Sequence, residues 1–279
     1  MDNMKKRAIA LGFFDGVHLG HQALLRKTME EARARDMAPA VFTFDRSPKE
    51  FVTGVPVPLI TTVAERRRVV ERLFPGMEMI VAPFDEKMRD TPWEDFLLML
   101  TRELRGGFLV AGHDFRFGAK NAGTPQLLME RSAQLGLGCA IVPAVLMDGQ
   151  VVSSTRIRRL LAEGDAQAAG QLLGRPFAIE GCTAPDSGPE SPDVCILPAE
   201  GQLMPACGAY ASYIERDGRR LPSVTYVRDA GDGSAFSAES RLLDSTIRLP
   251  QGECRVELLS ALSRDMEEAK AYFSRQNEI

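Results

Sequence analysis

The sequence lacks several features that would assign a function at once. Its five cysteines include no Cys-x-x-Cys pair, and the last four have no histidine near them. We therefore expect reduced thiols in the core and no zinc site. No apolar run approaches the length of a membrane span, and the basic start precedes too few apolar residues for a secretory signal. These absences favour a cytoplasmic protein without a membrane partner.

Excess basic charge is also missing. The net charge of -4 does not indicate the basic surface that general nucleic-acid binding needs, so we expect no nucleic-acid partner. The pattern Gly-x-x-x-x-Gly-Lys-Ser/Thr does not occur, which leaves a P-loop kinase or ATPase mechanism unsupported. Any anionic ligand, such as a small-molecule substrate, must therefore be bound by local groups.

The 279 residues exceed one typical domain and predict two, residues 1–176 and 177–279. The first half alternates apolar runs with helical patterns, as a Rossmann-like α/β domain with a buried parallel sheet requires. The predicted strands are Arg7–Leu11, Pro39–Phe44, Met79–Pro83, Gly107–Ala111 and Cys139–Val142. The predicted helices are Gln22–Asp36, Val63–Phe74, Pro92–Arg105, Gln126–Leu135 and Thr155–Glu163.

From Phe177 onward, short alternating runs punctuated by glycine and proline predict a small antiparallel β-barrel or sandwich. Asp217-Gly218 between two such runs is a hairpin signal. The predicted strands are Gly208–Ile214, Leu221–Val227, Glu239–Leu243 and Cys254–Leu259. A final helix is predicted over Ser260–Ser274, with a docking face formed by Leu262, Met266, Ala269 and Phe273.

The most informative segment, Gly12–His21, supplies two of the three histidines and follows an apolar run. An apolar run that ends at glycines and continues as a helical pattern predicts a strand, a loop and a helix N-terminus. Amides at such a terminus attract anions, and Gly16 and Gly20 allow a triphosphate to approach the main chain. His18 and His21 would donate hydrogen bonds to that anion, unless they are two histidines on an ordinary loop.

A second loop, Gly112–Gly118, follows another predicted strand. It combines Phe115 and Phe117 on one side with Arg116 on the other, which suits an aromatic ligand that carries phosphate. The alternative is that both rings belong to the core and that Arg116 pairs with an acidic neighbour.

A third segment, Ser153–Arg158, lies at a strand-to-helix junction, where Ser154 or Thr155 could simply cap the helix. Because Arg158 lies one turn inside the same helix, hydroxyls, amides and a cation can converge there on a second anion. Two phosphate-binding segments suggest a nucleoside triphosphate and fit nucleotidyl transfer, in which pyrophosphate leaves the α-phosphorus. With a magnesium ion, donors from both segments would position the phosphates and neutralise the leaving group.

Together, and in this order, the motifs resemble those of the bacterial bifunctional riboflavin kinase/FMN adenylyltransferases, the FAD synthetase family. The resemblance covers about Arg7 to Phe177 and rests on Gly-Phe-Phe-Asp-Gly-Val-His-Leu-Gly-His-Gln, Thr-Phe-Asp, Pro-Phe-Asp, Gly-His-Asp-Phe-Arg-Phe-Gly, Ser-Ser-Thr-Arg-Ile-Arg and Leu-Leu-Gly-Arg-Pro-Phe. It implies a nucleotidylyltransferase domain that transfers AMP from ATP to FMN, giving FAD and pyrophosphate, with Mg2+ as cofactor.

The resemblance also implies roles for single residues, with none assigned as a metal ligand. Catalytic roles fall on His18, His21, Ser154, Thr155 and Arg158, ATP binding on Gly12, Phe13, Asp15 and Gly20, and FMN binding on Asp114 and Arg116. Two departures bear on flavin affinity: Arg46-Ser47-Pro48 stands where the family commonly has Pro-His-Pro, and His113 replaces a more usual aromatic or apolar residue.

The C-terminal half resembles the family's riboflavin kinase module less well. The family's Gly-Phe-Pro-Thr-Ala-Asn, which serves the magnesium–nucleotide site, becomes Ser191-Pro192-Asp193-Val194-Cys195. A thiol at Cys195 cannot replace an amide oxygen on magnesium, although Asp193 could hold a metal. Glu239 still matches the family's catalytic base. We therefore expect a barrel domain with a degenerate kinase site.

Three alternatives stay open. The chain could be fully bifunctional, with riboflavin kinase activity retained. It could adenylylate another phosphate ester, such as a nicotinamide or pantetheine compound. Finally, it could be a non-enzymatic flavin-binding paralogue that keeps the fold without turnover.

Overall fold

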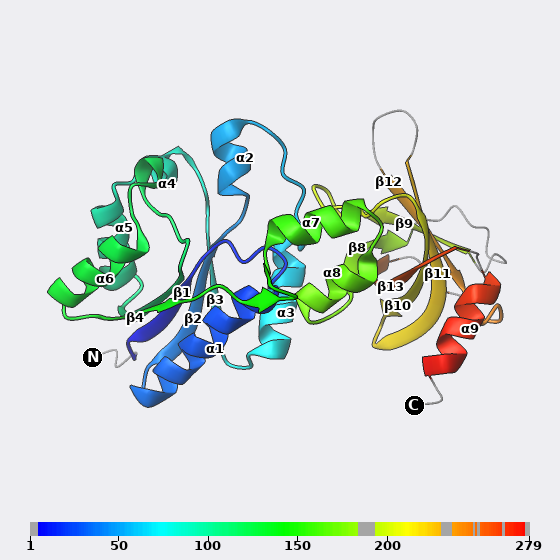
Figure 1. Cartoon of the computed structure of the whole chain (residues 1–279), viewed down its shortest axis with the longest axis horizontal. Coiled ribbons are helices and arrows are strands. Elements are labelled where there is room, and N and C mark those ends of the chain that lie inside the picture. The colour runs from blue at the N-terminus through cyan, green and yellow to red at the C-terminus, as the bar shows by residue number, and fades with distance from the viewer. Residues whose placement is uncertain are drawn as a thin grey trace. The chain divides into compact units, whose positions relative to one another are not determined.

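The computed structural model describes residues 5–183, 193–229, 236–247, 249, 252–263 and 266–276. The chain forms two compact units (Figure 1): Met1–Val57 with Val63–Val152, and Pro58–Thr62 with Ser153–Ile279. The predicted boundary after residue 176 coincides with the start of the first barrel strand, whereas the two helices before it group with the barrel.

A five-stranded parallel sheet forms the centre of the first unit, in the order β3-β2-β1-β4-β5. The strands are β1 (Arg7–Leu11), β2 (Ala38–Phe44), β3 (Glu78–Ala82), β4 (Gly106–Gly112) and β5 (Gly138–Val142). This arrangement confirms the predicted Rossmann-like fold. The strand order reverses between β1 and β4, which is where open α/β sheets bind ligands.

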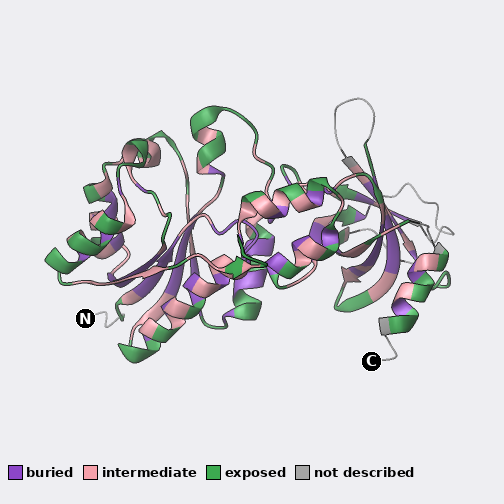
Figure 2. Cartoon of the chain, in the orientation of Figure 1, coloured by how far each residue is buried: buried purple, intermediate pink, exposed green. Residues whose placement is uncertain are grey.

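Helices cover both faces of this sheet (Figures 1 and 2). Alternate side chains of β1 serve the two faces, because Ala8 and Ala10 pack on one side and Ile9 and Leu11 on the other. The first side is covered by α1 (Leu19–Ala34) and α3 (Val63–Leu73), and the second by α5 (Trp93–Arg102) and α6 (Pro125–Gln134). Short elements complete the unit: α2 (Pro48–Thr53), α4 (Glu86–Asp90), a 3-10 turn (Ala119–Asn121), β6 (Leu146–Met147) and β7 (Gln150–Val151).

The second unit begins with α7 (Ser154–Ala162) and α8 (Ala166–Leu173) and continues as a closed barrel in the order β10-β11-β12-β9-β8-β13. Its elements are β8 (Phe177–Thr183), β9 (Asp193–Pro198), β10 (Gly208–Arg216), β11 (Arg219–Asp229), β12 (Phe236–Leu242), β13 (Gly252–Leu262) and α9 (Met266–Gln276). The predicted barrel and C-terminal helix are confirmed. Asp217 and Gly218 form the hairpin turn with φ angles of 46° and 73°.

The predicted start of the last helix is wrong. Residues 260–262 continue β13, where Ser260 pairs with Ala211 and Leu262 pairs with Ala209 of β10. Closing the barrel satisfies the backbone groups of this segment, so strand pairing overrides its helical spacing. The helix begins at Met266, and Ala269 and Phe273 are buried as predicted for a docking face. Among the described helices, none is both long and apolar enough to cross a membrane.

Candidate functional site

Two of the predicted loops follow neighbouring strands of the first unit. Leu11 at the end of β1 pairs with Ala111 near the end of β4, so the Gly12–His18 loop and the His113–Gly118 loop leave the same edge of the sheet. Because the strand order reverses between these two strands, a crevice for a ligand is expected there. The fold therefore brings the predicted ATP and FMN loops of this unit together at one edge.

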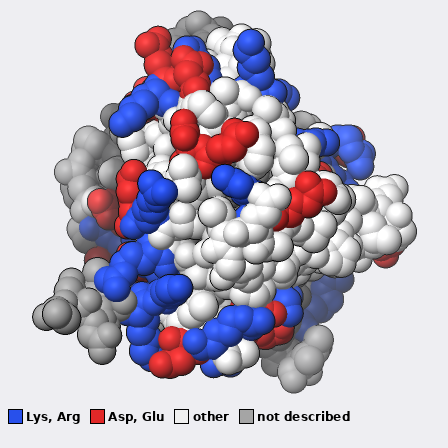
Figure 3. All heavy atoms as spheres, turned by 90° about the vertical axis from the view of Figure 1, so that its left-hand side faces the viewer, with Lys and Arg blue, Asp and Glu red and all other residues white. Residues whose placement is uncertain are grey.

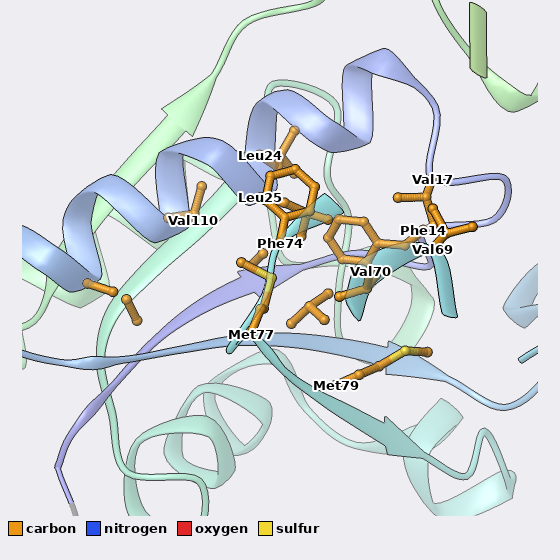
Figure 4. Packing of buried hydrophobic residues seen from close by; sticks show 14 of the residues in the cluster. Phe14, Val17, Leu24, Leu25, Val69, Val70, Phe74, Met77, Met79 and Val110 are labelled. Carbon is orange, nitrogen blue, oxygen red and sulfur yellow. The ribbon is translucent and has the colours of Figure 1, made fainter. Parts of the chain in front are cut away.

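The Gly12–His18 loop is anchored in the core. Phe14 and Val17 are fully buried and belong to the same cluster as Val69 and Val70 of α3 (Figure 4). Phe14, Gly16 and Val17 have φ angles of 56°, 84° and 42°. A positive φ is costly for a β-branched valine, so the surrounding packing must hold the loop in this shape.

His18 and His21 form a stacked pair at the N-terminus of α1. Their ring centroids lie 3.6 Å apart with an interplanar angle of 16°. His18 is the N-cap, and its Nδ1 accepts a hydrogen bond of 3.3 Å from the His21 amide. Because Nδ1 acts as an acceptor, the hydrogen of a neutral His18 ring is on Nε2, which is a donor. The predicted pair of histidines is thus brought together, and α1 begins three residues earlier than predicted.

Gly12 and Gly20, both predicted to serve ATP binding, are closely packed against their neighbours. A Cβ at Gly12 would lie 3.0 Å from the Phe14 ring. At Gly20 it would lie 3.0 Å from the His18 ring and 3.3 Å from the carbonyl oxygen of Val152. The chain segment just before Ser153 therefore lies against the first turn of α1, beside His18.

The second predicted phosphate segment forms the start of α7. Ser153 caps this helix by accepting a 3.3 Å hydrogen bond from the Arg156 amide. The alternative in which Ser154 or Thr155 caps the helix is not observed, because the helix begins at Ser154, one residue earlier than expected. Ser154 and Thr155 are in the first turn, and Arg158 Nε donates a 3.3 Å hydrogen bond to the Pro58 carbonyl.

Neither α1 nor α7 carries an acidic residue in its first turn. Carboxylates commonly occupy that position because they neutralise the positive end of the helix dipole. Their absence leaves each N-terminus suited to an external anion such as phosphate.

The His113–Gly118 loop carries the residues predicted to meet FMN. Phe115 and Phe117 stack at 5.4 Å with an interplanar angle of 16°, and Phe117 is buried in the core. Asp114 and Arg116 are exposed. Phe117 therefore lies in the core and Phe115 packs against it, close to the alternative of two core rings, while Asp114 and Arg116 stay accessible to a ligand.

Sequence reasoning missed an aromatic group at the ends of β2 and β3. Phe44 contacts Phe84 at 5.0 Å, and Phe84 contacts Phe51 of α2 at 5.6 Å. All three rings are partly exposed. The available signal was that Phe44 ends one predicted strand and Phe84 directly follows another. Ser47, one of the departures from the family motif, caps α2 by accepting from the Glu50 amide.

A buried arginine, Arg66 of α3, was also missed. Its guanidinium lies 4.6 Å from the centre of the Phe13 ring, inside the predicted ATP segment. Burial lowers the pKa of Arg66, and the charge of Asp15 opposes that shift.

In the barrel, the predicted kinase residues lie on adjacent strands. Glu239 of β12 pairs directly with Cys195 of β9, and Asp193 pairs with Arg241. Glu239 Oε2 lies 3.7 Å from Arg228 Nη2. Ser191 and Pro192 of the same motif are outside the described residues. The described residues include no group of three or more His, Cys, Asp or Glu side chains that could hold a metal ion.

The surface of the face shown in Figure 3 carries both signs of charge. Lysine and arginine groups alternate with aspartate and glutamate groups around a neutral centre. No single sign of charge dominates this face.

Comparisons with known proteins agree with the motifs. Residues 1–156 match the family model described as FAD synthetase. The chain is 30% identical over 283 residues to the bifunctional riboflavin kinase/FMN adenylyltransferase of Escherichia coli strain K12, covering 96% of this chain and 89% of that protein. It is 27% identical to the Listeria monocytogenes protein of the same name, over 96% and 93% of the two chains. The crystal structure of a macrolide-efflux protein from Streptococcus pneumoniae is similar with a TM-score of 0.81 and 25% identity, covering 98% of this chain and 93% of that chain.

Proposed function

This chain belongs to the FAD synthetase family, and from that premise we propose that it transfers AMP from ATP to FMN, giving FAD and pyrophosphate. The observation that carries the proposal is the stacked His18–His21 pair at the N-terminus of α1, at the edge of the sheet where the strand order reverses. Donors at that position suit a polyphosphate.

The proposed reaction is an in-line displacement. An oxygen of the FMN phosphate attacks the α-phosphorus of ATP, and the bond from that phosphorus to the β-phosphate oxygen breaks. The electron pair leaves with pyrophosphate, whose growing negative charge needs hydrogen-bond donors and cations. We assign that role to His18, His21, Ser154, Thr155 and Arg158. Mg2+ bound to the ATP phosphates would neutralise part of the same charge.

The remaining assignments concern where the substrates bind. The Gly12–Gly20 segment, including Phe13 and Asp15, is assigned to ATP. Asp114 and Arg116 are assigned to FMN, because their loop leaves the same edge of the sheet. The partly exposed rings of Phe44, Phe84 and Phe51 suit the planar isoalloxazine ring, since aromatic groups stack favourably.

The purified chain incubated with FMN, ATP and Mg2+ tests this proposal, with flavins separated by chromatography and pyrophosphate measured in parallel. We expect FAD and pyrophosphate in equal amounts. Nicotinamide mononucleotide and phosphopantetheine, offered in place of FMN, are expected to give no adenylylated product. Bound flavin without pyrophosphate release would instead support the non-enzymatic alternative.

We further propose that the barrel has lost most riboflavin kinase activity. Cys195 supplies a thiol where the family motif has an amide oxygen, and hard magnesium prefers oxygen ligands. Glu239, the family's base, lies near the Arg228 guanidinium.

A further inference from the structure

Arg66 is a fully buried cation beside the ATP segment, with 0% of its surface exposed. Its Nη1 donates hydrogen bonds of 2.9 Å to Thr43 Oγ1 and 3.1 Å to the Phe44 carbonyl. Its Nε and Nη2 meet no hydrogen-bond acceptor among the described residues. Burying a charge with open donors is costly, so stability alone does not account for an arginine at this position.

The contacts of Arg66 converge on Phe13. An arginine can only donate, so Thr43 Oγ1 must accept from Nη1 and direct its own hydrogen elsewhere. That hydrogen goes to the Phe13 carbonyl, at 2.6 Å. The guanidinium also stacks on the Phe13 ring, with 4.6 Å between its central carbon and the ring centroid. Arg66 thus contacts the ring of Phe13 directly and is linked to its carbonyl through the Thr43 hydroxyl.

Phe13 directly precedes the strained part of the Gly12–His18 loop. Phe14 and Val17 have positive φ angles, and the loop ends at His18, the N-cap of α1. A strained backbone keeps its shape only where its surroundings over-determine it. The core fixes Phe14 and Val17 from one side, and Arg66 fixes Phe13 at the entrance of the loop.

We propose that Arg66 is a positioning residue for adenylyl transfer, which holds Phe13, and thereby the loop that ends at His18, in the conformation that binds the ATP phosphates. This inference rests on the proposed function. A misplacement of about 1 Å in such a loop can cost about a hundredfold in rate.

The test compares Arg66→Met, which fills similar space without charge, with Arg66→Lys, Thr43→Val and the wild type. Arg67→Met is the matched control, because Arg67 is the next residue of α3 and is exposed. Steady-state kinetics of FAD formation, calorimetric ATP affinity and thermal unfolding are measured for each protein.

We expect Arg66→Met to unfold at or above the wild-type temperature while its kcat falls by about tenfold or more and its ATP affinity weakens. Added guanidinium ion should restore part of the rate. Arg66→Lys keeps the charge but lacks the planar guanidinium, so its kcat and ATP affinity should lie between those of the wild type and Arg66→Met. Arg67→Met should match the wild type.

Wild-type kcat and ATP affinity in Arg66→Met would overturn the inference, as would a loss of activity that only follows a loss of folded protein. If Arg66→Met does not fold, Thr43→Val decides, because it removes the hydroxyl while keeping the shape, and unchanged kinetics there also count against the role. A wild type that forms no FAD would overturn the proposed function instead, and ATP affinity across the variants would then test Arg66 separately.

Discussion

His18 and His21, which we assign to the ATP phosphates, form a stacked pair of imidazoles at the start of α1. Stacking at 3.6 Å and the bond from the His21 amide to His18 Nδ1 fix both rings relative to the first turn of α1. A donor that is already oriented costs no reorganisation when charge develops on the leaving group. Each ring should therefore contribute to the transition state more than to substrate binding.

Replacing His21 by alanine should lower kcat for FAD formation by about a hundredfold or more, since loss of one oriented donor has effects of that size. Alanine is the best helix former, so α1 should persist. The exposed residue Glu30 on the same helix gives the control Glu30→Ala, which should leave kcat unchanged. A His21→Ala protein with normal turnover would remove His21 from the mechanism.

Cys254 makes stability sensitive to alkaline pH. Burial, with a smaller effect of Cys182, raises the pKa of this thiol from 9.0 to about 11. Above pH 9.0 the unfolded chain loses the thiol proton while the folded chain keeps it, so rising pH favours unfolding. The contribution of this thiol is fully present below pH 9.0 and is lost as pH rises toward about 11.

The measurement is the urea midpoint of wild type and Cys254→Ala, below pH 9.0 and again near pH 11. Alanine leaves a small cavity and lowers both midpoints, but it has no proton to lose. The wild-type midpoint should therefore fall further with pH than that of the variant. Equal falls would show that the thiol does not titrate as its burial predicts.

Elements were predictable where local pattern and tertiary packing agree. The apolar runs of the five strands and the glycine-histidine motif follow from local sequence alone, and they place the candidate site at the edge of the sheet. Residues 260–262 could not be assigned locally, because pairing with β10 decides their state. The burial of Arg66 could not be predicted for the same reason. Arg66 is one of three consecutive arginines, and only the packing of α3 shows that it is the buried one.

At the N-terminus of α7, Ser153 caps the helix, whereas we assign Ser154 to the phosphates. Ser153→Ala removes the hydroxyl that accepts from the Arg156 amide, which should cost about 1 kcal/mol of stability and change kcat little. Ser154→Ala should leave stability nearly unchanged and lower kcat, because we assign its hydroxyl to the phosphates. Chemical denaturation and FAD kinetics on both variants check this division. The reverse pattern would show that Ser154, and not Ser153, supports the helix.

At the scale of the whole molecule, the chain passes between its two units more than once. Pro58–Thr62 belongs to the second unit although it lies between α2 and α3. Within that unit, the Leu59 amide donates to the Gly201 carbonyl and its carbonyl accepts from Leu203, each at 2.8 Å. The second unit also contains Ser154, Thr155 and Arg158. The residues that we assign to adenylyl transfer are therefore divided between the two units of the chain.

The proposed loss of kinase activity predicts a slow phosphorylation of riboflavin by the full chain. With ATP and Mg2+, phosphorylation of riboflavin should be at least about tenfold slower than adenylylation of FMN. Mutation of residues that only support the ligands of a metal site already lowers metal affinity or activity by about 10–100-fold. The double variant Asp193→Thr with Cys195→Asn restores the family's residues beside Glu239 and should gain FMN formation. Chromatography of the flavins measures both rates in one sample. FMN formation by the wild type at the rate of FAD formation would show that a thiol at position 195 does not impair the kinase site.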